Sequence, residues 1–192
     1  MQASKKEALR ADLYRYYGDQ LDSLKTRLRL AFLPSPEVKF LILLRKTQGS
    51  SNKLLYYWRR FRLLRHSYKC HIQIPAKTQI GRGFYIGHFG RVIIDPAAII
   101  GENCNIATGV TIGQTNRGKL KGTPKIGDRV WIGANAMIVG GITIGDDVLI
   151  APNAFVNFDV PSHSVVVGNP AVVHPRENAT EGYINRVYPP QK

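Results

Sequence analysis

The chain has 192 residues, and 44% of them are hydrophobic, which suits one domain, alone or with a small appendage, and excludes a wholly disordered protein. The net charge of +14 is uneven: residues 1–70 hold 16 Lys and Arg against 5 Asp and Glu, whereas residues 71–192 hold 11 against 8. Such a basic segment attracts nucleic acid, anionic lipid or an acidic polymer, or is only a solvated helical surface.

No targeting or spanning segment is visible in this sequence. The first residues, MQASKKEALR, lack an apolar signal region, and the longest compact apolar run, FLILL at residues 40–44, is too short for a bilayer. We therefore expect a cytoplasmic location. Because the N-terminal segment is basic, a peripheral location at the inner face of the membrane is the alternative. Cys70 and Cys104 show no metal-ligand spacing, so we expect both to be structural and we predict no metal site.

Four helices are predicted in the basic segment. A capping box at Ser4–Glu7 opens the first, which runs to about Gly18. Helical spacing of leucines predicts a second over residues 21–32, ended by prolines, and a third over 37–46. The fourth, KLLYYWRRFRLLRHSYKC, is amphipathic and basic, with an apolar stripe at Leu54, Trp58, Phe61 and Leu64. We expect that stripe to pack on a neighbour, with a membrane-surface role as the alternative.

From residue 74 onward, Ile or Val returns at every sixth position, often followed by Gly. The segments include IPAKTQ, IGRGFY, IGENCN, IATGVT and, after a basic excursion, IGDRVW, IGANAM and IGDDVL. A period of six fits neither a helix nor an alternating strand, and it is typical of a parallel β-helix whose inward Ile and Val stack from coil to coil. Thirteen such segments predict roughly four coils.

One stretch, IGHFGRVI at residues 86–93, breaks the repeat. The next in-phase Ile arrives two residues late, and the disturbance carries His88. Histidine titrates near neutral pH and is suited to accept a proton from an alcohol, so an outward His88 at this break is a candidate general base.

These segments, together with GQTNRGKLKGTPKIG and VVVGNPA, resemble the hexapeptide-repeat acyltransferases over about residues 70–173. The likeness is to the serine acetyltransferase branch and, more closely, to its relatives that O-acetylate sugars of surface polysaccharides. The resemblance implies a left-handed β-helix, a homotrimer with active sites between subunits, acetyl-CoA as donor, and a catalytic histidine that matches His88.

Three positions depart from the serine acetyltransferase pattern. The aspartate that orients the histidine there is Gln73 here, so a backbone carbonyl or another acid such as Asp95 takes that role. The acid before the histidine is Gly87, and the histidine of the family's HPKI is Thr123. Because the last two positions help to hold an amino-acid acceptor, their loss favours an acceptor without an ammonium group.

The resemblance also implies a donor site and a loop that reaches a neighbouring subunit. Pantetheine would pair with backbone near Gly113, Ala134, Ala151 and Pro152, and Trp131 matches a tryptophan beside the site, although a packing role fits it equally. The loop over residues 114–125 arches over a neighbour's site in this family. It carries no acid and four cations that could meet CoA phosphates or an anionic glycan, namely Arg117, Lys119, Lys121 and Lys125.

The sequence thus predicts a mainly β protein: a basic helical region (1–70), a left-handed β-helix (71–173) and a tail (174–192), the tail a short helix or a loose extension. The predicted function is acetyl-CoA-dependent O-acetylation of a sugar hydroxyl of a surface polysaccharide or its precursor. The alternatives are serine O-acetylation in cysteine biosynthesis and a non-catalytic trimeric scaffold, for which the basic region would be the working surface; nucleic acid is not an expected partner.

Overall fold

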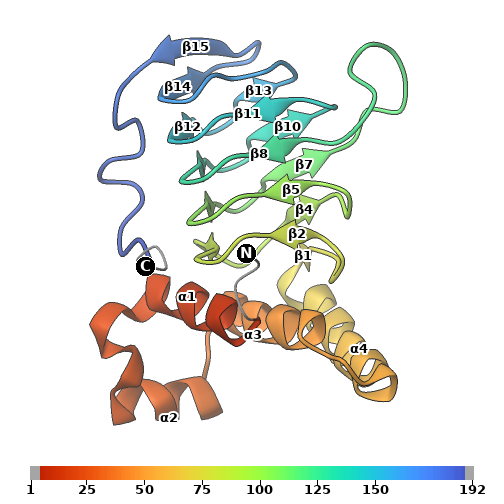
Figure 1. The fold of residues 1–192 in the computed structure, drawn as a ribbon, viewed down its shortest axis with the longest axis vertical. Helices are drawn as coiled ribbons and strands as arrows, with labels where there is room; N and C mark the ends of the chain where they lie inside the picture. Colours follow the sequence, from red (N-terminus) through yellow and green to blue (C-terminus); the bar gives the residue numbers. More distant parts are fainter. Residues whose placement is uncertain (1–4, 189–192) are drawn as a thin grey trace.

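The computed structural model describes residues 5–188 and places the helices at one end of a parallel β-solenoid (Figure 1). The helical base, residues 5–70, contains α1 (Lys5–Tyr17), the 3₁₀ helix η1 (Gly18–Asp22), α2 (Leu24–Phe32), α3 (Pro36–Gln48) and α4 (Lys53–Cys70). These agree with the predicted helices, except that the second is split. Ser23 starts a new helix there by accepting a hydrogen bond from the Thr26 N–H. Ser4 of the predicted capping box lies outside the described residues.

The solenoid has three sheets. Sheet A contains β1 (Ile72–Gln73), β4 (Val92–Ile94), β7 (Thr111–Gly113), β10 (Met137–Val139) and β13 (Phe155–Val156). Sheet B contains β2 (Gln79–Ile80), β5 (Ile99–Ile100), β8 (Lys125–Ile126) and β11 (Thr143–Ile144). Sheet C contains β3 (Tyr85–Ile86), β6 (Asn105–Ile106), β9 (Trp131–Ile132), β12 (Val148–Ile150), β14 (Ser164–Val167) and β15 (Val172–Pro175).

Neighbouring strands in all three sheets are parallel, apart from the antiparallel pair of β14 and β15 that closes the stack. The predicted β-helix is therefore confirmed, and the arrangement matches the left-handed hexapeptide fold. Sheet A has five levels rather than the roughly four expected, because β1 precedes the first six-residue segment recognised in the sequence.

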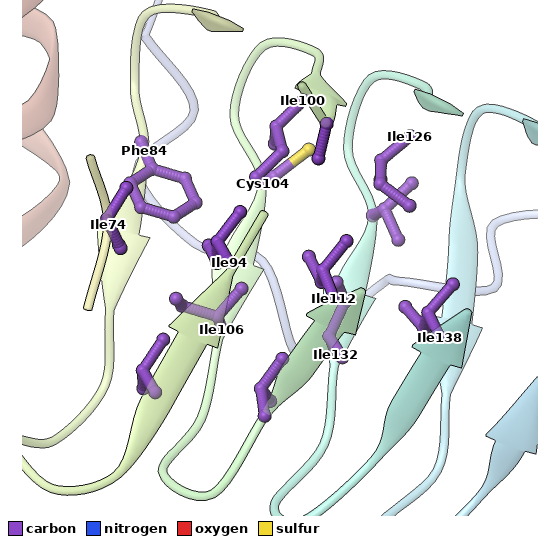
Figure 2. Packing of buried hydrophobic residues seen from close by; sticks show 14 of the residues in the cluster. Ile74, Phe84, Ile94, Ile100, Cys104, Ile106, Ile112, Ile126, Ile132 and Ile138 are labelled. Carbon is purple, nitrogen blue, oxygen red and sulfur yellow. The ribbon is translucent and has the colours of Figure 1, made fainter. Parts of the chain in front are cut away.

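Aliphatic side chains at the six-residue period form the core. Figure 2 shows them stacked along the axis, with Ile74, Ile94, Ile112 and Ile138 in one column. Each of these is at most 3% exposed, and burying such a side chain stabilises the fold by about 1.5–3 kcal/mol. Glycine follows Ile where adjacent coils approach closely: a Cβ on Gly101 would lie 2.5 Å from the Gly127 carbonyl oxygen. The Ile-Gly pairs of the repeat are explained by these two requirements: a buried side chain for the core, and no side chain where adjacent coils meet.

A buried ion pair joins the helical base to the first coil. Arg45 of α3 donates to Asp12 of α1 at 2.7 Å, and the two side chains are 5% and 0% exposed. Arg45 also donates to the Ile80 and Gly81 carbonyls, while Asp12 accepts the Phe84 N–H at 2.9 Å. The hydrogen bonds to solenoid backbone fix the position of α1 and α3 against the solenoid.

The tail returns along sheet C to the helical base (Figure 1). Residues 176–188 form turns, not the short helix or loose extension expected from the sequence. The Asp147 carboxylate accepts the N–H groups of Ala179 and Thr180 and the Thr180 hydroxyl. The same carboxylate also lies 2.9 Å from the His163 ring nitrogen Nδ1. Burial raises the pKa of Asp147, but these hydrogen bonds outweigh burial and hold the pKa below its ordinary value.

Among the described residues, no helix has the length and apolarity needed to cross a membrane.

Candidate active site

The predicted break in the repeat lies between sheets C and A. Ile86 pairs with Ile106 and Ile93 pairs with Thr111 on the next coil. Ile93 is seven residues after Ile86, whereas Thr111 is only five residues after Ile106. The lower coil therefore contains an insertion of two residues at this corner. We call the extended corner, residues 87–91, the ledge. The insertion predicted from the sequence is thus confirmed.

The ledge is held at both ends by the helical base. On its N-terminal side, the Tyr16 hydroxyl donates to the Ile86 carbonyl at 2.8 Å and accepts the Ile86 N–H at 3.0 Å. Burial raises the pKa of Tyr16 well above its usual value, so the hydroxyl keeps the proton that it donates. On the other side, the Gly90 N–H donates to the Cys70 carbonyl at the end of α4, at 3.0 Å. The ledge is therefore a fixed feature of the fold.

His88 lies exposed on the ledge. No described side chain hydrogen-bonds to its ring, whereas His163 in the cap lies 2.9 Å from an Asp147 carboxylate oxygen. A ring free of such a partner within one chain can accept a proton from a bound hydroxyl group, which is the requirement for a general base.

Part of the predicted donor site shares this corner with His88. Ala134 follows β9, and Ala151 and Pro152 follow β12, each at the turn from sheet C to sheet A. Consecutive levels are joined by a hydrogen bond from the Asn153 N–H to the Ala134 carbonyl, at 2.9 Å. Small side chains thus occupy this corner at the levels of β9 and β12.

Gly113 and the loop that carries the cations lie at the other edge of sheet A. Gly113 ends β7, and the loop that follows is closed at its base by reciprocal hydrogen bonds of 2.9 Å between Thr115 and Gly122. Thr123 uses its hydroxyl to donate to the Ala97 carbonyl at 3.1 Å. The charged residues of this segment are all exposed cations: Arg117, Lys119 and Lys121 lie in the loop, whereas Lys125 is the first residue of β8 in sheet B.

Neither candidate for orienting His88 contacts it within one chain. Asp95 lies beyond β4, at the far end of a strand roughly 10 Å long, and caps its own turn by accepting the Ala97 N–H at 2.8 Å. Gln73 lies on sheet A beside Ile93 and lines a hollow of about 420 Å³ beneath α4.

Trp131 has a packing role in the chain. Its ring lies 4.9 Å from that of Tyr183, centroid to centroid, so the tail covers it on sheet C. Cys104 is fully buried in the core, and burial raises the pKa of its thiol to about 12, which fits the structural role expected. Cys70 is also buried, at the end of α4.

The sequence did not reveal the residues that hold the ledge. Tyr16 and the Cys70 carbonyl act across long stretches of chain, and a carbonyl carries no side-chain signal at all. The double hydrogen bond of Tyr16 with Ile86 depends on how α1 docks, which local patterns do not contain. The sequence showed only that the ledge has two extra residues, and it did not show which residues hold the ledge in place.

Comparison with known proteins supports the repeat assignment. The family described as "Bacterial transferase hexapeptide (six repeats)" matches residues 123–157. Serine acetyltransferase from Helicobacter pylori is 43% identical over 100 residues, which are 52% of this chain and 58% of that protein. The chain thus matches little more than half of the length of that curated relative.

Solved structures extend the likeness to the helical base. Serine acetyltransferase from Neisseria gonorrhoeae, solved in complex with serine, has a TM-score of 0.70 and 30% identity, covering 88% of this chain and 69% of that one. Serine acetyltransferase from Brucella abortus has a TM-score of 0.74 and 25% identity, covering 91% and 70%.

These relatives correct the predicted acceptor. They are serine acetyltransferases, so the prediction of a sugar hydroxyl of a polysaccharide is wrong, and the alternative drawn from the same residues is favoured. The prediction gave most weight to the missing acid at Gly87 and the missing histidine at Thr123. Similarity along the solenoid and the helical base outweighs these two positions.

Proposed function

Because the chain belongs to the hexapeptide-repeat transferase family, we propose that it transfers the acetyl group of acetyl-CoA to the hydroxyl group of serine. The observation that carries this proposal is His88 on the two-residue insertion, in a chain 43% identical over 100 residues to a serine acetyltransferase. Donor, acceptor and catalytic residue all belong to the proposal.

His88 acts as the general base in this reaction. Its neutral ring accepts the hydroxyl proton while the oxygen attacks the thioester carbonyl, so that a C–O bond forms as the O–H bond breaks. The resulting intermediate expels the CoA sulfur, which takes the proton back from the imidazolium. The products are O-acetylserine and CoA. Exposure of His88 on the ledge gives the hydroxyl access to the ring.

We also propose that the working unit is a homotrimer. Within one chain, sheet A separates the corner with His88 and Ala134 from the corner with Gly113 and the cationic loop. A second copy that brings its loop beside the ledge unites the two groups. The outer face of sheet A offers a contact surface, since Ile93 and Met137 are 37% and 42% exposed.

The cationic loop would then serve the donor. Coenzyme A carries several phosphate charges, and four exposed Lys and Arg side chains without a neighbouring acid provide complementary charge. The line of small residues at Ala134, Ala151 and Pro152 leaves room for an extended chain such as pantetheine. Arg91 on the ledge is exposed as well and is suited to meet the carboxylate of serine.

The direct test is acetyl transfer to L-serine by the purified protein. We expect CoA release, followed with a thiol reagent, to require both acetyl-CoA and L-serine, with O-acetylserine identified by mass spectrometry. Alanine has the same ammonium and carboxylate groups without the hydroxyl and is the matched control. Release that is equally fast with alanine, or absent with serine although acetyl-CoA binds, would overturn the proposal.

A further inference from the structure

The outer face of α4 is apolar and unpartnered, contrary to the packing expected from the sequence. Its side chains at Leu54, Trp58 and Phe61 are 81%, 53% and 58% exposed, and Tyr68 is 79% exposed. The face turned to the protein has only Leu63 and Cys70 as buried residues. The helix therefore directs its larger apolar groups away from the fold. An exposed apolar stripe of this kind marks an interaction site.

Helix α4 as a whole is also strongly cationic, and three of its cations, Arg62, Arg65 and Lys69, line one hollow together with Phe61. Helix α4 carries six Lys and Arg residues and no Asp or Glu, and α2 carries three with none. Three of the acids in the helical base are engaged with other cations: Glu7 with Arg82, Asp12 with Arg45 and Asp22 with Arg10. Within residues 5–188, no ion pair neutralises α2 or α4.

Cations and aromatic rings are interleaved on α4. The Arg62 guanidinium lies 4.8 Å from the centre of the Trp58 ring, and that of Arg65 lies 5.9 Å from the Phe61 ring. Beside them, a hollow of about 200 Å³ between α3 and α4 is lined by Lys39, Arg62, Arg65 and Lys69, together with His66 and two apolar side chains. This hollow concentrates positive charge next to exposed aromatic groups, an arrangement that suits a phosphate-bearing surface.

Helix α2 adds a second apolar and basic face at the same end of the molecule. Leu24 and Phe32 are 72% and 77% exposed there. Figure 1 shows α2 and α4 at the edge of the helical base farthest from β15. The other end of α4 meets the ledge, where the Cys70 carbonyl accepts the Gly90 N–H.

We propose that α4, supported by α2, docks the protein on an anionic phospholipid surface. Charge decides between this occupant and a second copy of the chain. A two-fold contact would bring Arg62, Arg65 and Lys69 against the same three cations, with no acid on α4 to offset them. A cyclic contact would place this face against another surface of a neighbouring copy, which also carries a net charge of +14. An anionic bilayer instead offers phosphates to the arginines and an interfacial layer to Trp58 and Phe61.

Vesicle cosedimentation of the full chain tests the proposal. We expect binding to vesicles of phosphatidylcholine with phosphatidylglycerol, little binding to phosphatidylcholine alone, and loss of binding between about 0.1 M and 0.5 M NaCl as charge is screened. The double variant Arg62→Glu/Arg65→Glu should bind at least about thirtyfold more weakly, at roughly fivefold for each cation removed. Trp58→Ala/Phe61→Ala should weaken binding with the charge unchanged.

The matched control is Arg129→Glu/Arg176→Glu, which makes the same change in charge at two exposed positions away from α4, one in the solenoid and one in the tail. We expect this variant to bind as the unaltered protein does. Equal loss in both charge variants would show a response to net charge only and overturn the proposal, as would equal binding to neutral vesicles. Absence of vesicle binding at low salt would also overturn the proposal. If the α4 variants then lower the oligomeric state in analytical ultracentrifugation, the face serves protein association instead.

Discussion

The helical base and the solenoid share one buried apolar cluster but differ in where they place charge and the rest of their apolar surface. In the solenoid, Ile and Val point inward at every level, and the chain turns on Gly and polar residues. In the helical base, an ion pair is buried at Asp12 and Arg45, while Trp58 and Phe61 face outward. The solenoid is therefore stabilised by a repeated core. The base is held by apolar packing at the end of that core, through Phe40, Leu41 and Leu44 of α3, together with a few specific polar contacts.

This difference bears on the candidate site, which lies where the two regions meet. The ledge belongs to the solenoid, but its ends are fixed by Tyr16 and Cys70 of the helical base. A regular stack alone would present His88 without support. Each prediction below separates what one region contributes from what the other contributes.

The largest effect is expected for His88→Ala. Removal of a general base lowers kcat by about 10²–10⁴-fold. The melting temperature should hardly change, because His88 is exposed and no described side chain hydrogen-bonds to it. Initial rates of CoA release and a thermal melt of the same preparation give both readouts. Full activity in the variant would remove His88 from its proposed role.

Next in size is Arg45→Ala, which acts on stability. Removing one member of a buried ion pair typically costs about 3–5 kcal/mol, because Asp12 is left with an uncompensated charge. Chemical denaturation gives the free energy of unfolding. The matched control is Arg10→Ala, whose ion pair with Asp22 is exposed and is expected to contribute about 0–1 kcal/mol. Similar losses in the two variants would contradict a special role for the buried pair.

A smaller effect is expected for Asp147→Asn, which weakens the attachment of the tail. Asn tolerates the left-handed backbone at this position, where φ is 52°, so the change removes charge without backbone strain. The loss should be about 1–3 kcal/mol at neutral pH. Hydrogen exchange of the tail amides is expected to increase in the variant. Unchanged protection would show that ring packing on Trp131 holds the tail without the carboxylate.

The sign of the pH dependence follows from the lowered pKa of Asp147. A carboxylate with a depressed pKa stabilises the fold above its unfolded pKa of about 3.9, and that contribution is lost as the pH falls through the folded value. The difference in melting temperature between the original protein and Asp147→Asn should therefore be largest near neutral pH and shrink below about pH 4. A constant difference across that range would contradict the assignment.

The sequence predicted the solenoid well because its period is a local signal. Ile at every sixth position specifies the inward column directly, and the late arrival of Ile94 located the ledge. The docking of the helical base could not be predicted, since the bonds from Arg45 to Gly81 and from Tyr16 to Ile86 join distant segments. The outward face of α4 was misjudged for the same reason. An amphipathic pattern shows that a stripe exists, but not which side meets the protein.

The acceptor was predicted wrongly because single positions were weighed against the whole chain. Gly87 and Thr123 suggested the loss of an ammonium partner, yet a partner in an assembled site can come from another residue or another subunit. Within one chain, Asp95 accepts the Ala97 N–H and Gln73 lies beside Ile93, so neither residue shows how His88 is oriented in an assembled site.

The smallest effect is expected for Gly87→Asp. This variant tests whether the ammonium group of serine lacks an acidic partner at position 87. A Cβ at residue 87 would lie 3.6 Å from the Ile106 carbonyl oxygen and 3.8 Å from the Tyr85 ring, which are ordinary contacts, so a side chain fits beside His88. An added carboxylate provides a partner for the ammonium group of serine, and we expect KM for serine to fall about threefold to tenfold. Gly87→Asn has nearly the same shape without the charge and should leave KM unchanged. If Asn lowers KM as much as Asp does, the added contact is not electrostatic, and the ammonium group already has its partner elsewhere in the assembled site.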